Sequence, residues 1–120
     1  MRNFRELEIW KKGIELTIIL YQQSDLFPKE ETYGLKSQVL RAAVSIPVNI
    51  SEGCSRSSNK EFIRFLEIAI GSAFELETHL IIIKEIDLFK ADFDELFSRI
   101  HTLQSKINAF RNSVKKFDKK

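Results

Sequence analysis

The sequence predicts an all-α protein, folded as an antiparallel up-down-up-down bundle of four helices. Three observations lead to this prediction. Apolar residues recur at spacings of three and four along nearly the whole chain, which is the period of an amphipathic helix. Only four Gly and two Pro occur, and no run alternates as a half-buried strand does. The four periodic segments are joined by short connections, which favour antiparallel neighbours.

Composition indicates one domain, residues 1–120, able to bury its own core. Hydrophobic residues make up 43% and charged residues 30% of the chain, which is typical of a globular protein. The single cysteine excludes an internal disulfide and fits a reducing compartment. The first residues show no signal-peptide core, and the apolar run Leu80–Ile83 is far shorter than the roughly 20 residues of a membrane span. We therefore expect a cytoplasmic protein without a membrane segment. The net charge of +2 neither requires nor excludes a polyanionic partner.

The first helix is predicted from Arg5 to Gln23, ending before Ser24–Pro28, because the residue before a proline avoids the helical region. We expect its core stripe to consist of apolar residues at helical spacing. That stripe is Leu7, Trp10, Ile14, Thr17 or Ile18, and Tyr21. Further apolar residues (Ile9, Leu16 and Leu20) lie off the stripe and widen the apolar surface.

The second helix is predicted from Leu35 to Glu52, after a helical turn at Pro28–Glu31. Pro47 lies inside it and removes the hydrogen bond to the carbonyl of Ala43. The helix should kink at Pro47 unless Ser45 or a neighbour takes that carbonyl. We expect Gly53 to end the helix as a left-handed C′ residue. The expected core stripe is Leu35, Val39, Ala42, Ile46 and Asn49 or Ile50.

The third helix is predicted to begin after Ser58 and to end at Glu85 or Ile86. Ser58 and Glu61 form a capping-box pattern. Gly71 lies in the middle of this helix, where glycine is unfavourable, so we expect a neighbouring backbone to approach closely there. The expected core stripe is Phe62, Leu66, Ala69, Ala73, Leu76, Leu80 and Ile83, with Ile63, Phe65, Ile68, Ile70 and Ile81 on its flanks.

The fourth helix is predicted from Ala91 to Lys115, after a reversal at residues 87–92. It has the most regular heptad pattern in the chain, which indicates one face packed into a bundle core. The members of this pattern are Phe93, Leu96, Ile100, Leu103, Ile107, Phe110 and Val114.

The second helix and the reversal after it contain a recognisable motif. The run Arg41-Ala-Ala-Val-Ser-Ile-Pro-Val-Asn-Ile-Ser-Glu-Gly53 is followed by Lys60-Glu-Phe62 and later by Gly71-Ser and Glu75-Leu-Glu-Thr78. Together with Leu7…Trp10-Lys and Phe27-Pro, this pattern closely resembles the proteins encoded in intervening sequences of bacterial 23S rRNA genes, often labelled S23 ribosomal proteins. The resemblance covers nearly the whole chain. Ser51 stands where the family usually has alanine, and Cys54 where a small residue is common.

The resemblance implies a four-helix bundle that assembles into a ring-like homo-oligomer, pentameric in relatives. It implies no enzymatic activity and no cofactor. Binding of structured RNA is implied only by where the genes lie. The same fold occurs in accessory proteins of diversity-generating retroelements, which bind nucleic acid and a reverse transcriptase.

An enzymatic site finds little support in the residues. A carboxylate-bridged metal site in a bundle needs two Glu-x-x-His motifs, whereas Leu76 and Ser98 stand three residues before His79 and His101. Glu75 and His79 can share a helix face, but no second such pair exists. Cys54 has no histidine near it in sequence, which favours a structural residue over a nucleophile. We expect no metal and no catalytic residue.

The polar residues of the motif have two interpretations. In the first, they form a buried network that recognises a ligand. In the second, which we favour, they hold the kinked second helix to the third, because buried polar groups need partners. The motif residues are Arg41, Ser45, Pro47, Asn49, Glu52 and Gly53, with Glu75 and Glu77 on the third helix.

Two groups of cations are candidates for nucleic-acid binding. Arg56, Lys60 and Arg64 surround the start of the third helix, where a phosphate could bind. The second group lies on the fourth helix and the tail. The alternative to nucleic-acid binding is that these cations complement the negative end of the helix dipole. That group is Lys106, Arg111, Lys115 and Lys116, followed by Lys119 and Lys120. No aromatic platform is interleaved with these cations, so single-strand readout is not supported.

The apolar surplus on the first helix (Ile9, Leu16, Leu20) and the third (Ile63, Ile70, Ile81) predicts self-association, because a monomer exposing it would carry a large apolar patch. The first hypothesis is therefore a non-enzymatic homo-oligomer that binds structured RNA or other nucleic acid through backbone contacts. The alternative is a protein–protein scaffold or adaptor, for example an accessory subunit of a reverse transcriptase.

Overall fold

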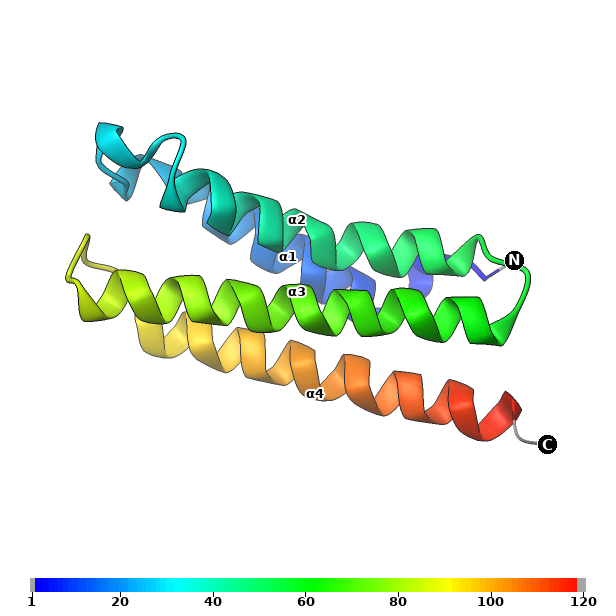
Figure 1. The fold of residues 1–120 in the computed structure, drawn as a ribbon. Coiled ribbons are helices and arrows are strands. Elements are labelled where there is room, and N and C mark those ends of the chain that lie inside the picture. The colour runs from blue at the N-terminus through cyan, green and yellow to red at the C-terminus, as the bar shows by residue number, and fades with distance from the viewer. Residues whose placement is uncertain (1, 119–120) are drawn as a thin grey trace.

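The computed structural model describes residues 2–118, and the regular structure of this part of the chain is entirely helical (Figure 1). Four α-helices pack side by side, each antiparallel to the next along the chain, in a body of 50 × 22 × 20 Å. The predicted four-helix architecture is confirmed. The helices are α1 (Glu8–Gln22), α2 (Leu35–Cys54), α3 (Asn59–Glu85) and α4 (Phe93–Asp118), with 3-10 turns at Phe4–Glu6, Ser24–Leu26 and Lys29–Glu31.

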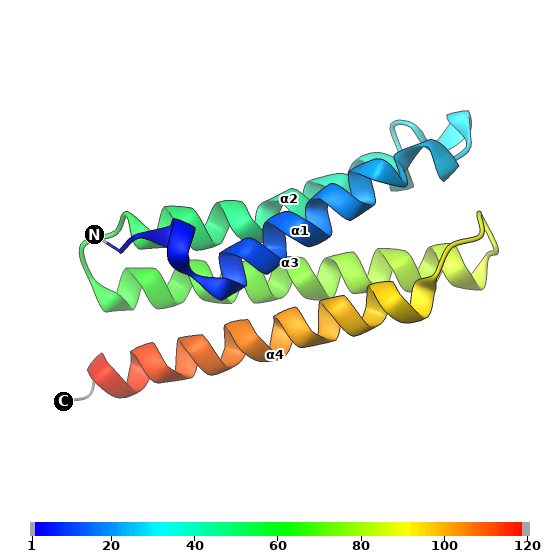
Figure 2. The same ribbon diagram turned by 180° about the vertical axis from the view of Figure 1, so that it is seen from behind.

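The two ends of the bundle carry different parts of the chain. The first described residues, the α2–α3 reversal and the last turn of α4 lie together at one end (Figure 1). The α1–α2 connection and the α3–α4 turn lie at the other end, where the rings of Phe27 and Phe89 meet edge to face at 4.8 Å. Figure 2 shows that α1 is the shortest of the four helices and that α4 extends beyond it.

The core is centred on α3, whose predicted stripe is confirmed at every position from Phe62 to Ile83. The stripes of α2 and α4 are also buried, except that Leu35, Asn49, Phe93 and Phe110 are only partly covered. Ser58 accepts a hydrogen bond from the backbone N–H of Glu61 at 3.2 Å, so the predicted N-cap of α3 is confirmed. Asp92 caps α4 in the same way through the N–H of Glu95 at 3.1 Å.

The prediction for the first helix is wrong in two respects. The helix begins at Glu8, because residues 4–6 form a separate 3-10 turn and Leu7 is extended. Its buried face includes all three residues that the sequence indicated as surplus, whereas Ile18 and Tyr21 are each 51% exposed. The buried face consists of Ile9, Gly13, Leu16 and Leu20. Ile63 of α3 is also buried, so these residues do not widen the outer surface.

α2 runs through Pro47 as one continuous helix. The Ala43 carbonyl loses its usual partner because proline has no N–H. It lies 3.2 Å from Thr17 Oγ1 of α1, whose one hydroxyl hydrogen it shares with the Gly13 carbonyl at 2.8 Å. Gly13 of α1 faces the proline ring: a Cβ at this position would lie 3.3 Å from Pro47 Cδ. A neighbouring helix therefore satisfies the freed carbonyl, and the predicted kink stays a prediction.

The prediction for Gly53 is wrong, and the close approach predicted at Gly71 does not occur within one copy of the chain. Gly53 is not a left-handed cap, because no glycine in the described chain has a positive φ and α2 continues to Cys54. It is buried, and a Cβ there would lie 2.8 Å from Phe62 Cδ1 and 2.9 Å from Phe65 Cβ. Gly71 has no atom within 4 Å of a built Cβ, so no neighbouring backbone approaches it within the monomer. Its cost in a helix, up to about 1 kcal/mol relative to alanine, is not explained by the packing of one copy.

Candidate nucleic-acid interface

Charge is strongly polarised along the bundle, although the net charge is small. The end with the α2–α3 reversal (residues 2–6, 52–67 and 108–117) has eight cations and four carboxylates, and we call it the basic end. The opposite end (residues 22–36 and 82–97) has four cations and eight carboxylates, and we call it the acidic end. Such a separation produces a directional field that a sequence-wide net charge conceals. The cations of the basic end are Arg2, Arg5, Arg56, Lys60, Arg64, Arg111, Lys115 and Lys116.

The antiparallel topology brings most of the two predicted cation groups to this end. Some of these cations are unpaired there, and others are already paired with carboxylates. Arg56, Lys60 and Arg64 are exposed, as is Lys116 on α4. Arg56 lies over the ring of Phe65, with Cζ 4.7 Å from the centroid. None of these four side chains has an ion pair or side-chain hydrogen bond within residues 2–117. They are therefore available to bind phosphate.

The other predicted cations are already engaged. Arg111 Nη1 lies 3.1 Å and Lys115 Nζ 3.7 Å from the same carboxylate oxygen of Glu67 on α3. Arg111 also donates to Asn108 and Asn112, and its side chain is only 23% exposed. Lys106 lies nearer the middle of the bundle, where its Nζ is 3.3 Å from Glu8 of α1. Lys119 and Lys120 lie outside the described residues.

Sequence reasoning missed Arg2, which ties the N-terminal segment to the α2–α3 reversal. Its guanidinium lies over the ring of Phe62 at 4.1 Å and donates to the Asn59 side chain. Its backbone N–H donates to the carbonyl of Cys54 at 3.4 Å. No sequence pattern links residues so far apart, so this cation could only be found from the structure.

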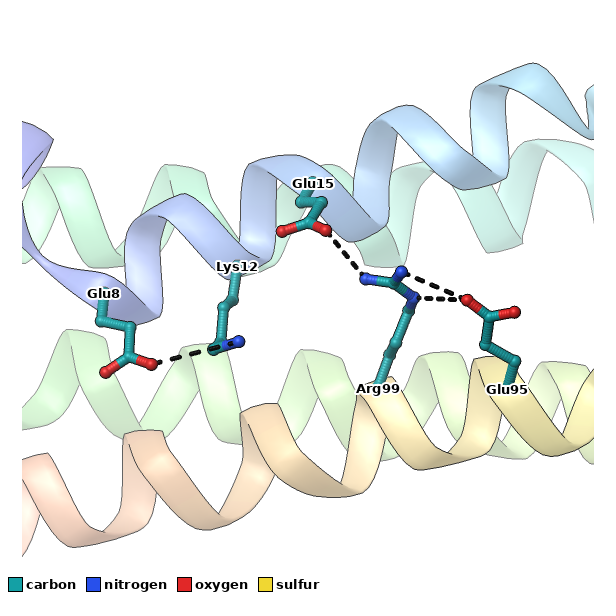
Figure 3. Close-up of polar contacts among 5 residues, drawn as sticks. All are labelled: Glu8, Lys12, Glu15, Glu95 and Arg99. Atoms are coloured by element: carbon teal, nitrogen blue, oxygen red, sulfur yellow. Dashed lines mark hydrogen bonds and ion pairs between the residues drawn. The ribbon is translucent and has the colours of Figure 1, made fainter.

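The seam between α1 and α4 is also charged, but its charges neutralise one another (Figure 3). Arg99 of α4 lies between Glu15 of α1 at 3.0 Å and Glu95 of its own helix at 3.2 Å. These hydrogen bonds raise the pKa of the Arg99 guanidinium, and the bond to Glu15 contributes more than the bond to Glu95. On α1, Glu8 lies 4.0 Å from Lys12. This seam offers a phosphate little unpaired charge.

A polar cluster joins α2 to α3 in the middle of the bundle. The hydroxyls of Ser45 and Ser72 lie 2.8 Å apart, and Asn49 donates to the Ser45 carbonyl and hydroxyl at 2.8 and 2.9 Å. Through Ser45, Asn49 takes part in holding α2 to α3, as the favoured interpretation predicts. The prediction that Arg41 and Glu52 also hold α2 to α3 is wrong, because their exposed side chains have no polar partner in the described part of the chain.

Asn49→Ala should lower the free energy of unfolding by about 1–2 kcal/mol, because it removes both hydrogen bonds and leaves the Ser45 hydroxyl with one partner fewer. Urea denaturation followed by circular dichroism measures this change. Ser113→Ala is the matched control, because its exposed hydroxyl bonds only to Phe110 of its own helix. An equal effect of the two variants would contradict the role assigned to Asn49.

The remaining titratable groups form short pairs rather than a catalytic set. His79 Nε2 lies 3.3 Å from Glu75, and its Nδ1 is buried without a partner. Glu77 accepts from Gln104 and pairs with His101, and these two hydrogen bonds hold the pKa of its carboxyl below the usual value. Burial raises the pKa of the Cys54 thiol. Within the described residues, no three His, Cys, Asp or Glu side chains gather as they would around a metal ion.

The fold and this interface define an antiparallel four-helix bundle with one basic and one acidic end. Residues 5–109 match the family model described as 23S rRNA-intervening sequence protein. The chain therefore belongs to that family. Among solved structures it is similar to a protein of unknown function from the S23 ribosomal protein family of Bacteroides thetaiotaomicron, with a TM-score of 0.79 and 20% identity. The similarity covers 87% of this chain and 95% of that chain, and at this identity it establishes the fold alone.

A search of the curated proteins gave no match. Within residues 2–118, no helix is long and apolar enough to cross a bilayer.

Proposed function

We propose that this chain is a non-enzymatic, homo-oligomeric protein of the cytoplasm that binds structured RNA through the phosphate backbone. The main support is the basic end, where Arg56, Lys60 and Lys116 are exposed and unpaired within the described residues. Cations that are not already neutralised release counterions when they bind phosphate, and this release drives non-specific binding. The family name adds that its members are encoded in 23S rRNA intervening sequences, which favours RNA as the polyanion.

The surroundings of these cations favour a duplex over a single strand. Proteins that bind single strands stack successive bases on several exposed aromatic rings. At the basic end the ring of Phe65 is covered by Arg56 and that of Phe62 by Arg2. Phe117 is 77% exposed, but one ring does not form a platform for successive bases. A-form RNA is recognised mostly by its shape and by contacts to phosphates and 2′-hydroxyls. We therefore expect the protein to contact the phosphates and sugars of the duplex and to make no sequence-specific contact to the bases.

Binding of a 23S rRNA hairpin should weaken steeply with salt, and the triple variant Arg56→Gln, Lys60→Gln, Lys116→Gln should flatten this dependence. Fluorescence anisotropy between 50 and 200 mM salt measures the slope. Removing one cation that neutralises a phosphate lowers the log–log slope by roughly 0.7–0.9, so removing all three should lower it by roughly 2–3.

The matched control is Lys29→Gln, Lys36→Gln, Lys90→Gln, which removes the same charge from the acidic end. Equal reductions of the slope in the two triple variants would show that only net charge matters and would contradict the site. Weak binding with no salt dependence would favour the protein-adaptor function instead.

A further inference from the structure

One outer face of the bundle, between α1 and α2, is apolar along its centre, and Arg41 and Glu52 are exposed at its edge on α2. On α1 it presents Ile14, Ile18 and Tyr21, and on α2 it presents Val44 and Val48, which is 45% exposed. A groove of about 370 Å³ runs along this face between Trp10, Ile14 and Thr17 on one side and Val44, Pro47 and Val48 on the other. This is far more than the roughly 10–15 Å³ of space needed to hold one water. The groove can therefore receive a side chain.

The polar groups of the groove are already satisfied. Thr17 Oγ1 donates to a backbone carbonyl, with oxygens of Gly13 and Ala43 at 2.8 and 3.2 Å. The Ser51 hydroxyl donates to the Val48 carbonyl at 2.9 Å. No lysine, arginine, aspartate or glutamate lines the groove. Its chemistry fits an apolar occupant.

A second outer face, on α3, carries an apolar side chain that projects from the helix and a glycine that packing leaves unexplained. Phe74 is 57% exposed, and Ile68 and Ile82 are each 41% exposed. Gly71 lies between them on the outer side, with nothing within 4 Å of a built Cβ. A glycine on an apolar helix surface lets another helix approach closely, and within one copy no helix does so.

The heights of these two faces along the bundle can be compared through the contacts inside one copy. The Ser45–Ser72 hydrogen bond sets residue 45 of α2 level with residue 72 of α3. Because the two helices are antiparallel, Phe74 is level with Ala43, and the hydrogen bond from Thr17 places α1 residue 17 at the same height. Phe74 is thus level with the middle of the groove, although it lies on a different helix of its own copy.

We propose that copies of this chain pack side by side with their long axes parallel, and that Phe74 of each copy enters the α1/α2 groove of the next. This inference rests on the self-association in the proposed function and names the surfaces that carry it. Copies related by rotation about an axis parallel to the bundle keep their heights, so Phe74 meets Thr17 and Val44. Gly71 is then level with residue 46 of the neighbour's α2, within one helical turn of Val48, and its missing side chain allows the two helices to approach.

Charge supports the parallel arrangement. At the shared edge of the two faces, the height of Arg41 of α2 is within one residue of that of Glu75 of α3, and the height of Glu52 is within one residue of that of Arg64. Both pairs have opposite signs, and Arg41 and Glu52 have no partner within the described part of their own copy. Turning the neighbour upside down about Phe74 places Arg41 level with Ser72 instead of Glu75 and removes the first match. Electrostatic matching of this kind fixes the register of an interface.

The contact uses two different surfaces, one on each partner. Contacts of this type continue from copy to copy and close into a ring when the rotation permits, in contrast to a two-fold contact, which ends at a dimer. Parallel packing also brings every basic end to the same side of the assembly. Repetition of Arg56 and Lys60 around that side would multiply the number of phosphates that one assembly can contact.

A mixing experiment with two blocked variants tests the proposal. Val48→Glu places a charge in the groove, and Phe74→Glu places one on the inserted side chain; both positions are partly exposed, so the monomers should fold. Light scattering at fixed concentration should show wild type as an oligomer and each variant alone as a monomer. An equimolar mixture should give a species of twice the monomer mass and nothing larger, because only one intact groove and one intact Phe74 remain to pair.

Each other outcome has a defined meaning, with circular dichroism confirming that the variants are helical. A monomeric wild type would overturn self-association and with it this contact, while the salt dependence of RNA binding could still hold. An oligomeric Phe74→Glu would overturn the contact alone and leave self-association standing. Two monomeric variants that do not pair when mixed would show that the groove and Phe74 do not meet. Tyr33→Glu, at a side chain 96% exposed at the acidic end, is the control and should remain an oligomer.

Discussion

Phe62→Ala is expected to lower the free energy of unfolding by about 3–5 kcal/mol, a large part of the 5–15 kcal/mol typical of a domain. Phe62 is fully buried at the start of α3 and contacts three other segments. Its ring meets Phe110 of α4 edge to face at 5.8 Å, lies beneath Arg2, and leaves no space for a side chain at Gly53 of α2. Removing the ring would leave a cavity where all of these meet.

Urea denaturation at one fixed protein concentration measures this decrease, since self-association makes stability depend on concentration. Phe62→Leu should cause a smaller decrease, because much of the apolar volume remains. Tyr33→Ala is the control: this aromatic residue is 96% exposed, and its removal should change stability by less than about 0.5 kcal/mol. A decrease below about 1 kcal/mol for Phe62→Ala would show that the basic end is not held together by this ring.

The helical periodicity predicted α3 and α4 correctly because each has one stripe that is clearly more apolar than the rest. α1 has two apolar stripes, and the period alone does not decide which one is buried. The neighbour decides: Gly13 allows α1 to approach Pro47 closely, which turns Leu16 inward and leaves Ile18 outside. The stripe expected in the core is therefore the one that borders the outer groove.

Gly53 shows the same dependence on tertiary contacts. A glycine after a long helix predicts a left-handed cap, but here the aromatic rings of Phe62 and Phe65 occupy the space of a side chain. α2 instead ends one residue later, after Cys54, with the Ser55 N–H donating to the Glu52 carbonyl at 3.0 Å. The glycine is needed for packing, and its backbone stays helical.

The candidate interface could be predicted in part. Arg56, Lys60 and Arg64 are close in sequence, so their grouping follows from one reversal and one helical turn. The engagement of Arg111 and Lys115 by Glu67 depends on the register between α3 and α4, and the pairing of Lys106 with Glu8 depends on the register between α1 and α4. Register between helices so far apart in the chain is set by side-chain packing, which sequence spacing does not show. Net charge concealed the polarity of the bundle for the same reason.

Reversal of either charge in the proposed Arg41–Glu75 pair is expected to dissociate the assembly, and reversal of both is expected to restore it. Arg41→Glu brings two carboxylates together at every interface, and Glu75→Arg brings two guanidinium groups together. Like charges facing each other across an interface cost several kcal/mol, which corresponds to a rise of at least about tenfold in the dissociation constant. Sedimentation across a dilution series measures that constant for wild type, the two single variants and the double variant.

The double variant separates a direct contact from a general effect of charge, because its net charge equals that of the wild type. Additive effects of the two substitutions would mean that Arg41 and Glu75 do not face each other, whereas recovery gives their coupling energy directly. Lys29→Glu with Glu85→Arg makes the corresponding exchange at the acidic end, at two exposed side chains, and should leave assembly unchanged. In a closed ring the pair recurs at every interface, so even a partial recovery per contact should be visible in the mass of the assembly.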